Sequence, residues 1–194
     1  MSNQKTKWGV LLARFQPIHN GHLHLIEQAV NENDKVLLII GSANKINERN
    51  PIPISFRQEL VEQAIAEKFT DEQQAKIVIM PLDDLTSEID NSVEWGYYLH
   101  MNIAEAIGTV FFTMYYSDGW EIVMEWFPAF IRNNYVSFKL NARGNILNNL
   151  SATKVRGYIL DDDKVSLAKS VPNCVLNNAN ALKHYIKATK ITKE

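Results

Sequence analysis

Five short apolar runs, rich in β-branched and aromatic residues, recur along the chain. Two of them end at residues that terminate strands, Gly41 and Pro81. Runs of this length and composition predict strands that are buried on both faces. The predicted strands are Trp8–Ala13, Val36–Ile40, Lys76–Met80, Val110–Tyr116 and Tyr135–Leu140.

Between these runs, apolar residues recur every three or four positions, which is the spacing of one buried face of a helix. The first such pattern begins at His22, and the second runs towards Phe69 from Ser55 and Gln58, a pair typical of a capping box. The apolar positions are Leu25, Ile26, Ala29 and Val30 in the first pattern and Leu60, Ala64 and Ile65 in the second.

Two further helices are expected in the second half of the chain. We expect Ser92 to cap one of them and Gly108 to stop it. A second is expected over Glu121–Phe127, interrupted near Pro128. The apolar face of the helix that follows Ser92 carries Trp95, Leu99, Ile103 and Ile107.

Strand and helix therefore alternate about five times, which favours a parallel sheet with helices on both faces. We predict an α/β protein with a Rossmann-like, doubly wound parallel sheet of about five strands and a short helical C-terminal region. The whole chain, residues 1–194, is expected to be one domain, with a core over about 7–160 and helices over about 161–190. In such sheets ligands bind at the carboxyl ends of the strands.

Composition narrows the classes of function. The chain has 20 Lys and Arg against 22 Asp and Glu, so the net charge of −2 provides no overall field for grasping nucleic acid, although a local cationic pocket remains open. The single cysteine, Cys174, excludes an internal disulfide, fits a reducing compartment and is expected to be packed. The acidic triplet Asp161–Asp163 is interpreted as a solvated turn, with a metal site as the weaker alternative.

Targeting signals are not evident. The polar stretch Met1–Lys7 lacks the apolar core of a signal peptide, and the longest clean apolar run, Val36–Ile40, is far below the ~20 residues of a membrane span. We therefore expect a soluble, cytoplasmic protein without nucleic-acid or membrane partners. Homo-oligomerisation stays open, because the aromatic stretch Trp120–Phe130 suits an interface as well as a core.

The strongest chemical signal is the sequence Arg14-Phe15-Gln16-Pro17-Ile18-His19-Asn20-Gly21-His22, between the first predicted strand and the first predicted helix. The free N–H groups and the dipole at a helix start favour phosphate. Gly21 permits close approach of the backbone, and two imidazoles three residues apart can point at one phosphate. Alternatives are a metal site built on His19 and His22 and a purely structural loop, and no role is assigned to His24.

A second signal follows the asparagine-rich piece Asn141–Asn149, which is interpreted as a surface loop. Ser151 is placed to cap a helix, and Thr153 and Arg156 share one face of it. Hydroxyls, free N–H groups and a guanidinium would again converge on an anion.

The first segment resembles the ATP-binding (H/T)xGH signature of the nucleotidyltransferase superfamily, and its Arg-Phe-Gln-Pro form is most similar to the nicotinamide-nucleotide adenylyltransferases of the archaeal type and their bifunctional bacterial relatives. The segment Ser151–Arg156 resembles the superfamily's second signature. Three positions depart from the pattern: Ala13 replaces a usual Gly, Phe56 stands where Glu is common, and Leu150 replaces Ile.

The resemblance implies transfer of AMP from ATP to nicotinamide mononucleotide, with release of pyrophosphate. It implies that His19, His22 and Arg156 are catalytic, with His22 steadying the transition state. The residues implied in ATP binding are Arg14, Phe15, His19, Gly21, His22, Ser117, Asp118, Ser151, Thr153 and Arg156. Those implied in acceptor binding are Ser42, Ala43, Asn44, Arg57, Asn91 and Trp95, with core packing as the alternative for Trp95.

Mg²⁺ is expected with ATP as co-substrate, mainly on phosphate oxygens and water, because Mg²⁺ takes few protein ligands. The chain shows no dedicated carboxylate cage, although Asp83 and Asp84 could contribute. Alternatives within the superfamily are other acceptors: phosphopantetheine, FMN, or a sugar or alcohol phosphate with CTP. A non-catalytic nucleotide sensor is a further alternative.

Overall fold

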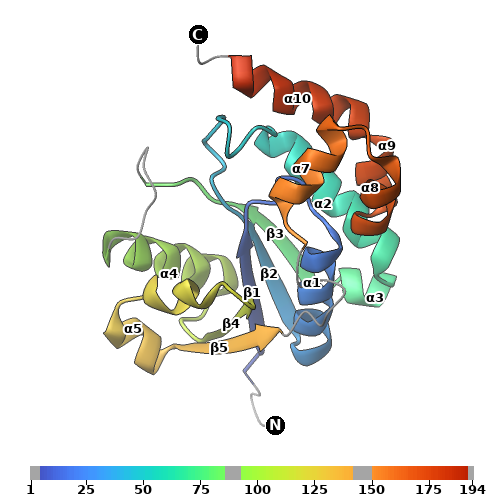
Figure 1. The fold of residues 1–194 in the computed structure, drawn as a ribbon. Helices are drawn as coiled ribbons and strands as arrows, with labels where there is room; N and C mark the ends of the chain where they lie inside the picture. Colours follow the sequence, from blue (N-terminus) through green and yellow to red (C-terminus); the bar gives the residue numbers. More distant parts are fainter. Residues whose placement is uncertain (1–4, 86–92, 142–149, 192–194) are drawn as a thin grey trace.

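The strands form one parallel sheet, as expected. The computed structural model describes residues 5–85, 93–141 and 150–191, and in these ranges five strands pair in the order β3-β2-β1-β4-β5 (Figure 1). Every neighbouring pair is parallel. The strands are β1 (Trp8–Ala13), β2 (Lys35–Ile40), β3 (Ile77–Pro81), β4 (Phe112–Ser117) and β5 (Val136–Asn141), each within two residues of its predicted start and one of its predicted end.

The helices connect the strands and extend the chain beyond the sheet. The first half contains α1 (Asn20–Glu32), α2 (Ile54–Lys68) and α3 (Asp71–Gln74). The second half contains α4 (Val93–Ile107), η1 (Glu121–Glu125), which is a 3₁₀ helix, and α5 (Ala129–Asn134). The C-terminal region contains α7 (Ala152–Leu160), α8 (Lys164–Ser170), α9 (Asn173–Asn177) and α10 (Ala179–Ile191).

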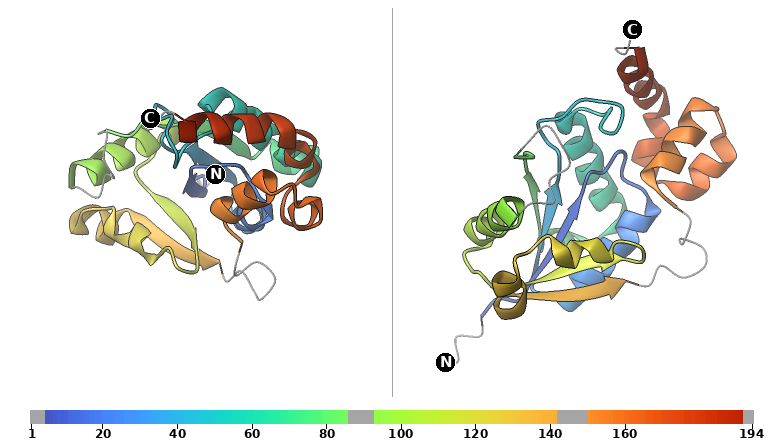
Figure 2. Two further views of the ribbon diagram at one scale, coloured as in Figure 1. Left: turned by 45° about the horizontal axis from the view of Figure 1, so that its top comes forward. Right: turned by 60° about the vertical axis from the view of Figure 1, so that its left-hand side comes forward.

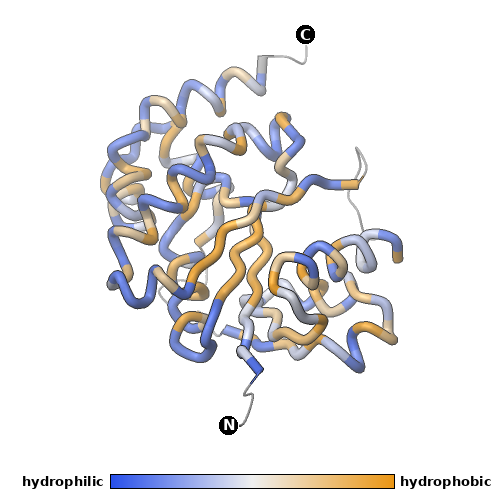
Figure 3. The backbone as a smooth tube through the Cα atoms, turned by 180° about the vertical axis from the view of Figure 1, so that it is seen from behind, coloured by the Kyte–Doolittle hydropathy of each residue, from blue (hydrophilic) through white to orange (hydrophobic). Residues whose placement is uncertain are grey.

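Both faces of the sheet are covered, because successive side chains of a strand point to opposite faces. In β2, Val36, Leu38 and Ile40 lie in the core with α1 and α2, and Leu37 and Ile39 lie in the core with α4, η1 and α5. Figure 3 shows the strands as a continuous hydrophobic centre between more hydrophilic helices. This double burial explains why the strand sequences lack alternation.

The C-terminal helices join the core on the α1–α2 side (Figure 2). Helix α10 packs on α7, and α9 packs on α2. The Glu67 carboxylate of α2 accepts hydrogen bonds from the backbone N–H groups of Asn173 and Cys174, at 2.8 and 2.7 Å. Cys174 is buried there, as expected. Its pKa is raised to about 12, mainly by burial and to a smaller extent by the nearby negative charge of Glu67. The expected turn at Asp161–Asp163 is also present: Asp163 caps α8, and Asp162 pairs with Lys183.

Two local helix predictions are wrong or incomplete. The Ser55–Gln58 capping box is absent, because α2 begins at Ile54 directly after Pro53, whose fixed φ starts the helix, and Gln58 instead donates to Glu62. The helix expected over Glu121–Phe127 is shorter, Glu121–Glu125, and α5 starts after Pro128.

The predicted surface loop Asn141–Asn149 is wrong for its first residue, because Asn141 is buried and is the last residue of β5. Residues 142–149 and the expected helix cap Ser92 lie outside the described residues. The aromatic stretch Trp120–Phe130 divides between surface and core: Trp120 and Phe130 are exposed, and Phe127 is buried. Among the described helices, none has the length and apolar character to cross a membrane.

The sheet order places a topological switch between β1 and β4. From β1 the chain proceeds outward to β2 and β3, then returns to the other side of β1 for β4 and β5. Loops that leave β1 and β4 therefore diverge at their carboxyl ends, where ligands bind in doubly wound folds. The loop from β1 to α1 carries the first sequence motif.

Candidate active site

The loop between β1 and α1 is held in an unusual conformation by buried contacts. Phe15 is buried and adopts a φ of 48°, a left-handed value that is rare for a bulky residue. The buried Gln16 side chain donates to the carbonyl of Ile52 at 3.2 Å and accepts from its N–H at 2.9 Å. The loop is thereby pinned to the segment that precedes α2.

The two imidazoles of the motif stack on each other at the start of α1. The centroids of His19 and His22 lie 3.7 Å apart with an angle of 23° between the rings, and the Phe15 ring lies 4.8 Å from that of His22. The backbone N–H of His19, at the N-cap position, donates to Nδ1 of His22 at 3.3 Å. A neutral His22 therefore carries its proton on Nε2, where it can act as a donor.

Gly21 makes room for this pair. A Cβ at position 21 would lie 3.0 Å from Cε1 and 3.1 Å from Nδ1 of His19, and His19 is only 2% exposed. The glycine therefore has a steric reason within the protein itself, in addition to the close ligand approach expected from the sequence.

The second motif lies directly against the first. Ser151 caps α7 by accepting from the N–H of Lys154 at 3.2 Å, as expected. The Nη1 group of Arg156 donates to the carbonyl of Gln16 at 2.9 Å, and its Nη2 group donates to the hydroxyl of Thr153 at 3.4 Å. Residues 140 positions apart thus form one surface at the carboxyl end of β1.

Three guanidiniums make this region positive although the whole chain carries −2: Arg14 and Arg156 are half-buried at the surface, and Arg57 is buried behind them. Burial, followed by repulsion from a neighbouring arginine, lowers the pKa of Arg14, Arg57 and Arg156, and for Arg57 the pKa falls to about 10. All three remain protonated at neutral pH. Clustered, partly desolvated cations of this kind attract a polyanion such as a triphosphate.

Two charged residues next to this cluster were not anticipated from the sequence. After burial, repulsion from Arg49 is the next cause of the lowered pKa of Arg14. The negative charge of Glu48 opposes the lowering of the pKa of Arg156 and offsets part of it. Both sit in a tight turn in which the Asn47 side chain accepts from the N–H groups of Arg49 and Asn50, at 3.0 and 2.9 Å. The asparagines that flank this pair were the available signal of a turn.

The loop after β2 contains the predicted acceptor residues Ser42, Ala43 and Asn44. Ser42 is buried with a φ of 50°, and the N–H of Ala43 donates to the carbonyl of Leu82 at 3.0 Å. The Asn44 side chain is exposed and joins the backbone of Asp84 by two hydrogen bonds, each 3.1 Å long.

A salt bridge closes the same corner, since Lys45 Nζ lies 2.6 Å from Asp84 Oδ2. This ion pair was not predicted. Lys45 and Asp84 each follow the end of one of two neighbouring strands, β2 and β3, and this position is the feature of the sequence that could have indicated the pair.

Arg57 reaches these loops from α2 and is completely buried. Its Nη1 group donates to the carbonyls of Arg14 and Gly41, both at 2.8 Å, and its Nη2 group donates to the carbonyl of Ser42 at 3.0 Å. The guanidinium thus lies between the loop after β1 and the loop after β2.

The remaining predicted residues are more dispersed. Trp95 lies on α4 and is 6% exposed. Its side chain packs in the core between α4 and the sheet, with its ring 5.6 Å from that of Tyr98, as the core-packing alternative predicts. Ser117, which is buried, and Asp118, which is exposed, lie at the carboxyl end of β4. Asn91 lies outside the described residues.

Metal-ligating side chains do not cluster in the described part of the chain. In the ranges 5–85, 93–141 and 150–191, no group of three His, Cys, Asp or Glu is placed to hold a metal ion. Of the two acids considered for magnesium, Asp83 is exposed and Asp84 is engaged by Lys45.

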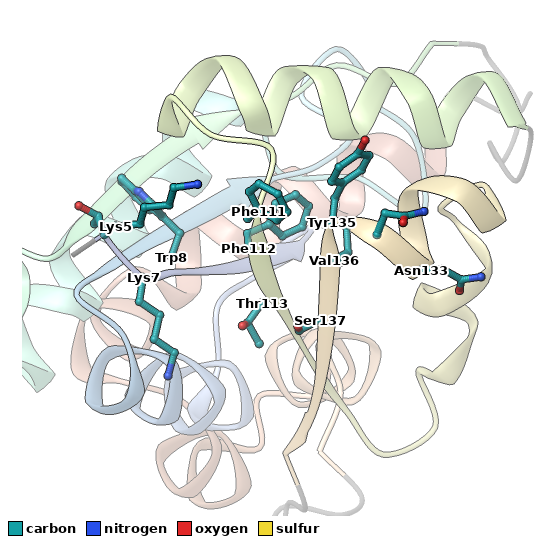
Figure 4. Close-up of a pocket in the computed structure, with 12 residues that line it drawn as sticks. Lys5, Lys7, Trp8, Phe111, Phe112, Thr113, Asn133, Tyr135, Val136 and Ser137 are labelled. Carbon is teal, nitrogen blue, oxygen red and sulfur yellow. The ribbon is translucent and has the colours of Figure 1, made fainter. Parts of the chain in front are cut away.

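The cavity shown in Figure 4 lies away from the motifs. It has a volume of about 340 Å³ and is lined by residues 5–8, 111–113 and 133–137, at the amino ends of β1, β4 and β5. The motif residues lie at the opposite, carboxyl ends of the strands. Lys5, at its rim, lies 5.3 Å from the centre of the Phe111 ring. We therefore locate the candidate site by the convergence of the two motifs and not by this cavity.

Comparison with known proteins identifies the family of the chain. A family model described as cytidylyltransferase-like matches residues 10–157, a range that contains both motifs. A nicotinamide-nucleotide adenylyltransferase of Thermococcus sibiricus is 30% identical over 176 residues, which cover 90% of this chain and 84% of that protein. One of Thermococcus kodakarensis is 31% identical over 94 residues, but these cover only 48% of this chain and 47% of that relative.

A solved structure shares the fold. The bifunctional NMN adenylyltransferase/ADP-ribose pyrophosphatase of Francisella tularensis superposes with a TM-score of 0.67 at 20% identity, over 94% of this chain and 50% of that one. At this level of identity the likeness concerns the fold. It agrees with the parallel, doubly wound sheet described above.

Proposed function

Because this chain belongs to the cytidylyltransferase-like family of nucleotidyltransferases, we propose that it transfers the adenylyl group of ATP to nicotinamide mononucleotide, with NAD and pyrophosphate as products. The observation that carries the proposal is the contact between Arg156 and the carbonyl of Gln16, which brings the two motifs into one cationic surface. The names of the relatives at about 30% identity support the choice of acceptor.

The reaction is an in-line displacement. An oxygen of the acceptor's 5′-phosphate attacks the α-phosphorus of ATP, the bond from that phosphorus to the bridging oxygen breaks, and pyrophosphate leaves with the electron pair. No covalent enzyme intermediate is needed, so catalysis consists of positioning the two substrates and stabilising charge on the phosphates.

The residues at the start of α1 suit the α-phosphate. Because Nδ1 accepts from the backbone N–H of His19, a neutral His22 carries its proton on Nε2, and we assign this N–H to an α-phosphate oxygen as charge develops there. The first N–H groups of α1, next to Gly21, add donors and a favourable dipole. The buried His19 stacks on His22 and so holds its ring in place; its own contact with the phosphate stays a prediction.

The guanidiniums suit the β- and γ-phosphates, which become the leaving group. Arg14 approaches from the end of β1 and Arg156 from α7, with the Thr153 hydroxyl and the capped start of α7 beside it. Forked donors of this type bind phosphate with two parallel hydrogen bonds. In this proposal Mg²⁺ arrives with the triphosphate and supplies further neutralisation of its charge, on ligands that ATP and water provide.

The acceptor is placed on the other side of β1, next to the loop after β2. In this loop Ser42 is buried, Ala43 is half-buried, and the exposed Asn44 amide is bonded to the backbone of Asp84, so in this proposal the loop shapes the acceptor side of the site. Trp95 would face the pyridine ring only if its indole turned out of the core, so its role in binding stays a prediction.

An acceptor panel tests the proposal. The protein is incubated with ATP and Mg²⁺ and, separately, with nicotinamide mononucleotide, nicotinate mononucleotide, FMN and phosphopantetheine, and pyrophosphate and the dinucleotide are measured. We expect NAD and pyrophosphate in equal amounts with nicotinamide mononucleotide. Product from a different acceptor alone would reassign the substrate, and ATP binding without turnover on any acceptor would identify a sensor instead.

A further inference from the structure

The Arg57 guanidinium is committed to the protein backbone. Three hydrogen bonds join it to the carbonyls of Arg14, Gly41 and Ser42, at 2.8, 2.8 and 3.0 Å. Both protons of Nη1 are used in this way, since a guanidinium nitrogen of that type carries two. The resemblance described above instead implies that this arginine binds the acceptor, whose phosphate is the natural partner of a guanidinium.

Solvent and ligands do not reach the side chain as it is packed. Arg57 is 0% exposed, and its Nε atom is buried without a hydrogen-bond partner in the described part of the chain. The N–H protons that the carbonyls leave over, on Nε and Nη2, are therefore enclosed by the protein. A phosphate could contact them only if the residues packed around the guanidinium moved apart, and a movement that parted it from its carbonyls would leave those carbonyls unpaired at an energetic cost.

The three carbonyls belong to two loops with different tasks in the proposed reaction. The parallel ladder between β1 and β2 ends with the pair Ala13 and Ile40, and the Gly41 N–H donates to the Ala13 carbonyl at 2.9 Å just beyond it. Arg57 continues this connection past the end of the ladder, from the loop of the first motif to the loop of the acceptor residues.

The same contacts hold two strained backbones. Phe15 and Ser42 have φ values of 48° and 50°, in the left-handed region that L-residues with a side chain adopt at an energetic cost. The Arg14 carbonyl belongs to the peptide that precedes Phe15, and the Ser42 carbonyl to the peptide that follows Ser42. One buried side chain thus fixes a peptide next to each strained residue.

From these contacts we propose that Arg57 is a positioning residue: it sets the separation of the ATP-binding loop and the acceptor-binding loop, and it does not contact the acceptor phosphate. This inference rests on the proposed function. In-line displacement needs the attacking oxygen and the α-phosphorus at a defined distance, and a misplacement of about 1 Å costs about 100-fold in rate. Loops that drift apart would still bind each substrate but would present them poorly to one another.

The variants Arg57→Lys and Arg57→Gln test the proposal. We expect kcat to fall about 100-fold in both, with the KM of ATP and of the acceptor within about threefold of wild type. Lysine should rescue little, because a single ammonium cannot bridge three carbonyls as the guanidinium fork does. A phosphate contact would give the opposite pattern: a rise in acceptor KM of about tenfold or more, partly rescued by lysine, which would overturn the proposal.

A matched control separates positioning from loss of stability. Tyr115 is buried at the C-terminal end of α1, where its hydroxyl donates to Glu32 and accepts from Asn33, both at 2.8 Å. The variant Tyr115→Phe should lower the melting temperature as the Arg57 variants do, yet keep the kcat and both KM values of wild type. Equal losses of kcat in all variants would show a general effect of destabilisation and would contradict the proposal.

A measurement on the wild-type protein covers the case in which the Arg57 variants do not fold. The ¹⁵Nε resonance of Arg57 is followed by NMR while the acceptor is added. We expect it to stay in place, and a shift that tracks saturation of the acceptor would contradict the proposal. Failure of the wild-type protein to make product from any acceptor would refute the proposed function itself, so the two failures are distinguishable.

Discussion

Replacing Gly21 by alanine should slow catalysis without weakening the fold. The added Cβ would lie 3.0 Å from Cε1 of His19, closer than a normal van der Waals contact. His19 is 2% exposed and stacked against His22 at 3.7 Å, so its ring cannot simply turn into solvent. We expect both imidazoles to shift by a few tenths of an ångström relative to the α-phosphate.

The size of the effect follows from that shift. If about 1 Å of misplacement costs about 100-fold, a few tenths of an ångström should cost roughly 3- to 10-fold in kcat. Stability should move the other way, because alanine is favoured over glycine in a helix by about 0.5–1 kcal/mol, which offsets the strain of the contact. The variant should therefore keep its melting temperature and lose turnover.

The assay is pyrophosphate release at saturating ATP and acceptor, combined with a thermal melt. Gly157→Ala is the matched control, because Gly157 also lies in a helix beside a motif residue, but a Cβ there would meet nothing within 4 Å. It should be as stable as wild type or more so, with unchanged kcat. A Gly21→Ala protein with the kcat of wild type would refute the steric argument.

Three further predictions concern other parts of the chain. Arg156→Ala should weaken ATP binding about 10- to 100-fold in calorimetry, because it removes a charged donor worth about 1.5–3 kcal/mol, and unchanged affinity would argue against the contact. Gly96→Ala should lower the free energy of unfolding by about 1–3 kcal/mol or more, because the added Cβ would lie 2.6 Å from Cδ of Pro128 and closer still to the Trp126 carbonyl. Urea unfolding measures this loss, and an unfolding midpoint equal to that of wild type would show that the packing is looser. Since the pKa of Cys174 is raised to about 12, its thiol stays neutral as pH rises from 7 to 9, and iodoacetamide should label the native protein far more slowly than the urea-unfolded one; equal rates would contradict the burial.

The strands were predictable because each is buried on both faces and so has an almost uninterrupted apolar sequence. The run Val36–Ile40 predicts β2 to within one residue, since no surface position interrupts it. The start of α2 was predicted wrongly. The prediction used Ser55 and Gln58 as a capping box, whereas the helix begins directly after Pro53, two residues earlier than Ser55. Short-range capping patterns are weak evidence beside a proline.

The site was predictable in its first motif and in its pairing with the second, because phosphate chemistry needs particular side chains at a helix start. The contacts of Arg57 could not be predicted in this way, because its guanidinium binds carbonyls in two loops that precede it in the sequence by 15 to 43 residues. The burial of Trp95 in the core was the alternative that the sequence left open, and sequence alone does not distinguish a core indole from one that meets a ligand.

The central claim is that two segments about 140 residues apart hold one triphosphate. NMR of the wild-type protein tests it most directly, with the ring signals of His22 and the Nε–H signal of Arg156 followed during one titration with a non-hydrolysable ATP analogue and Mg²⁺. The account predicts that both sets of signals shift and saturate with the same Kd. Saturation of one set while the other stays unmoved would contradict it.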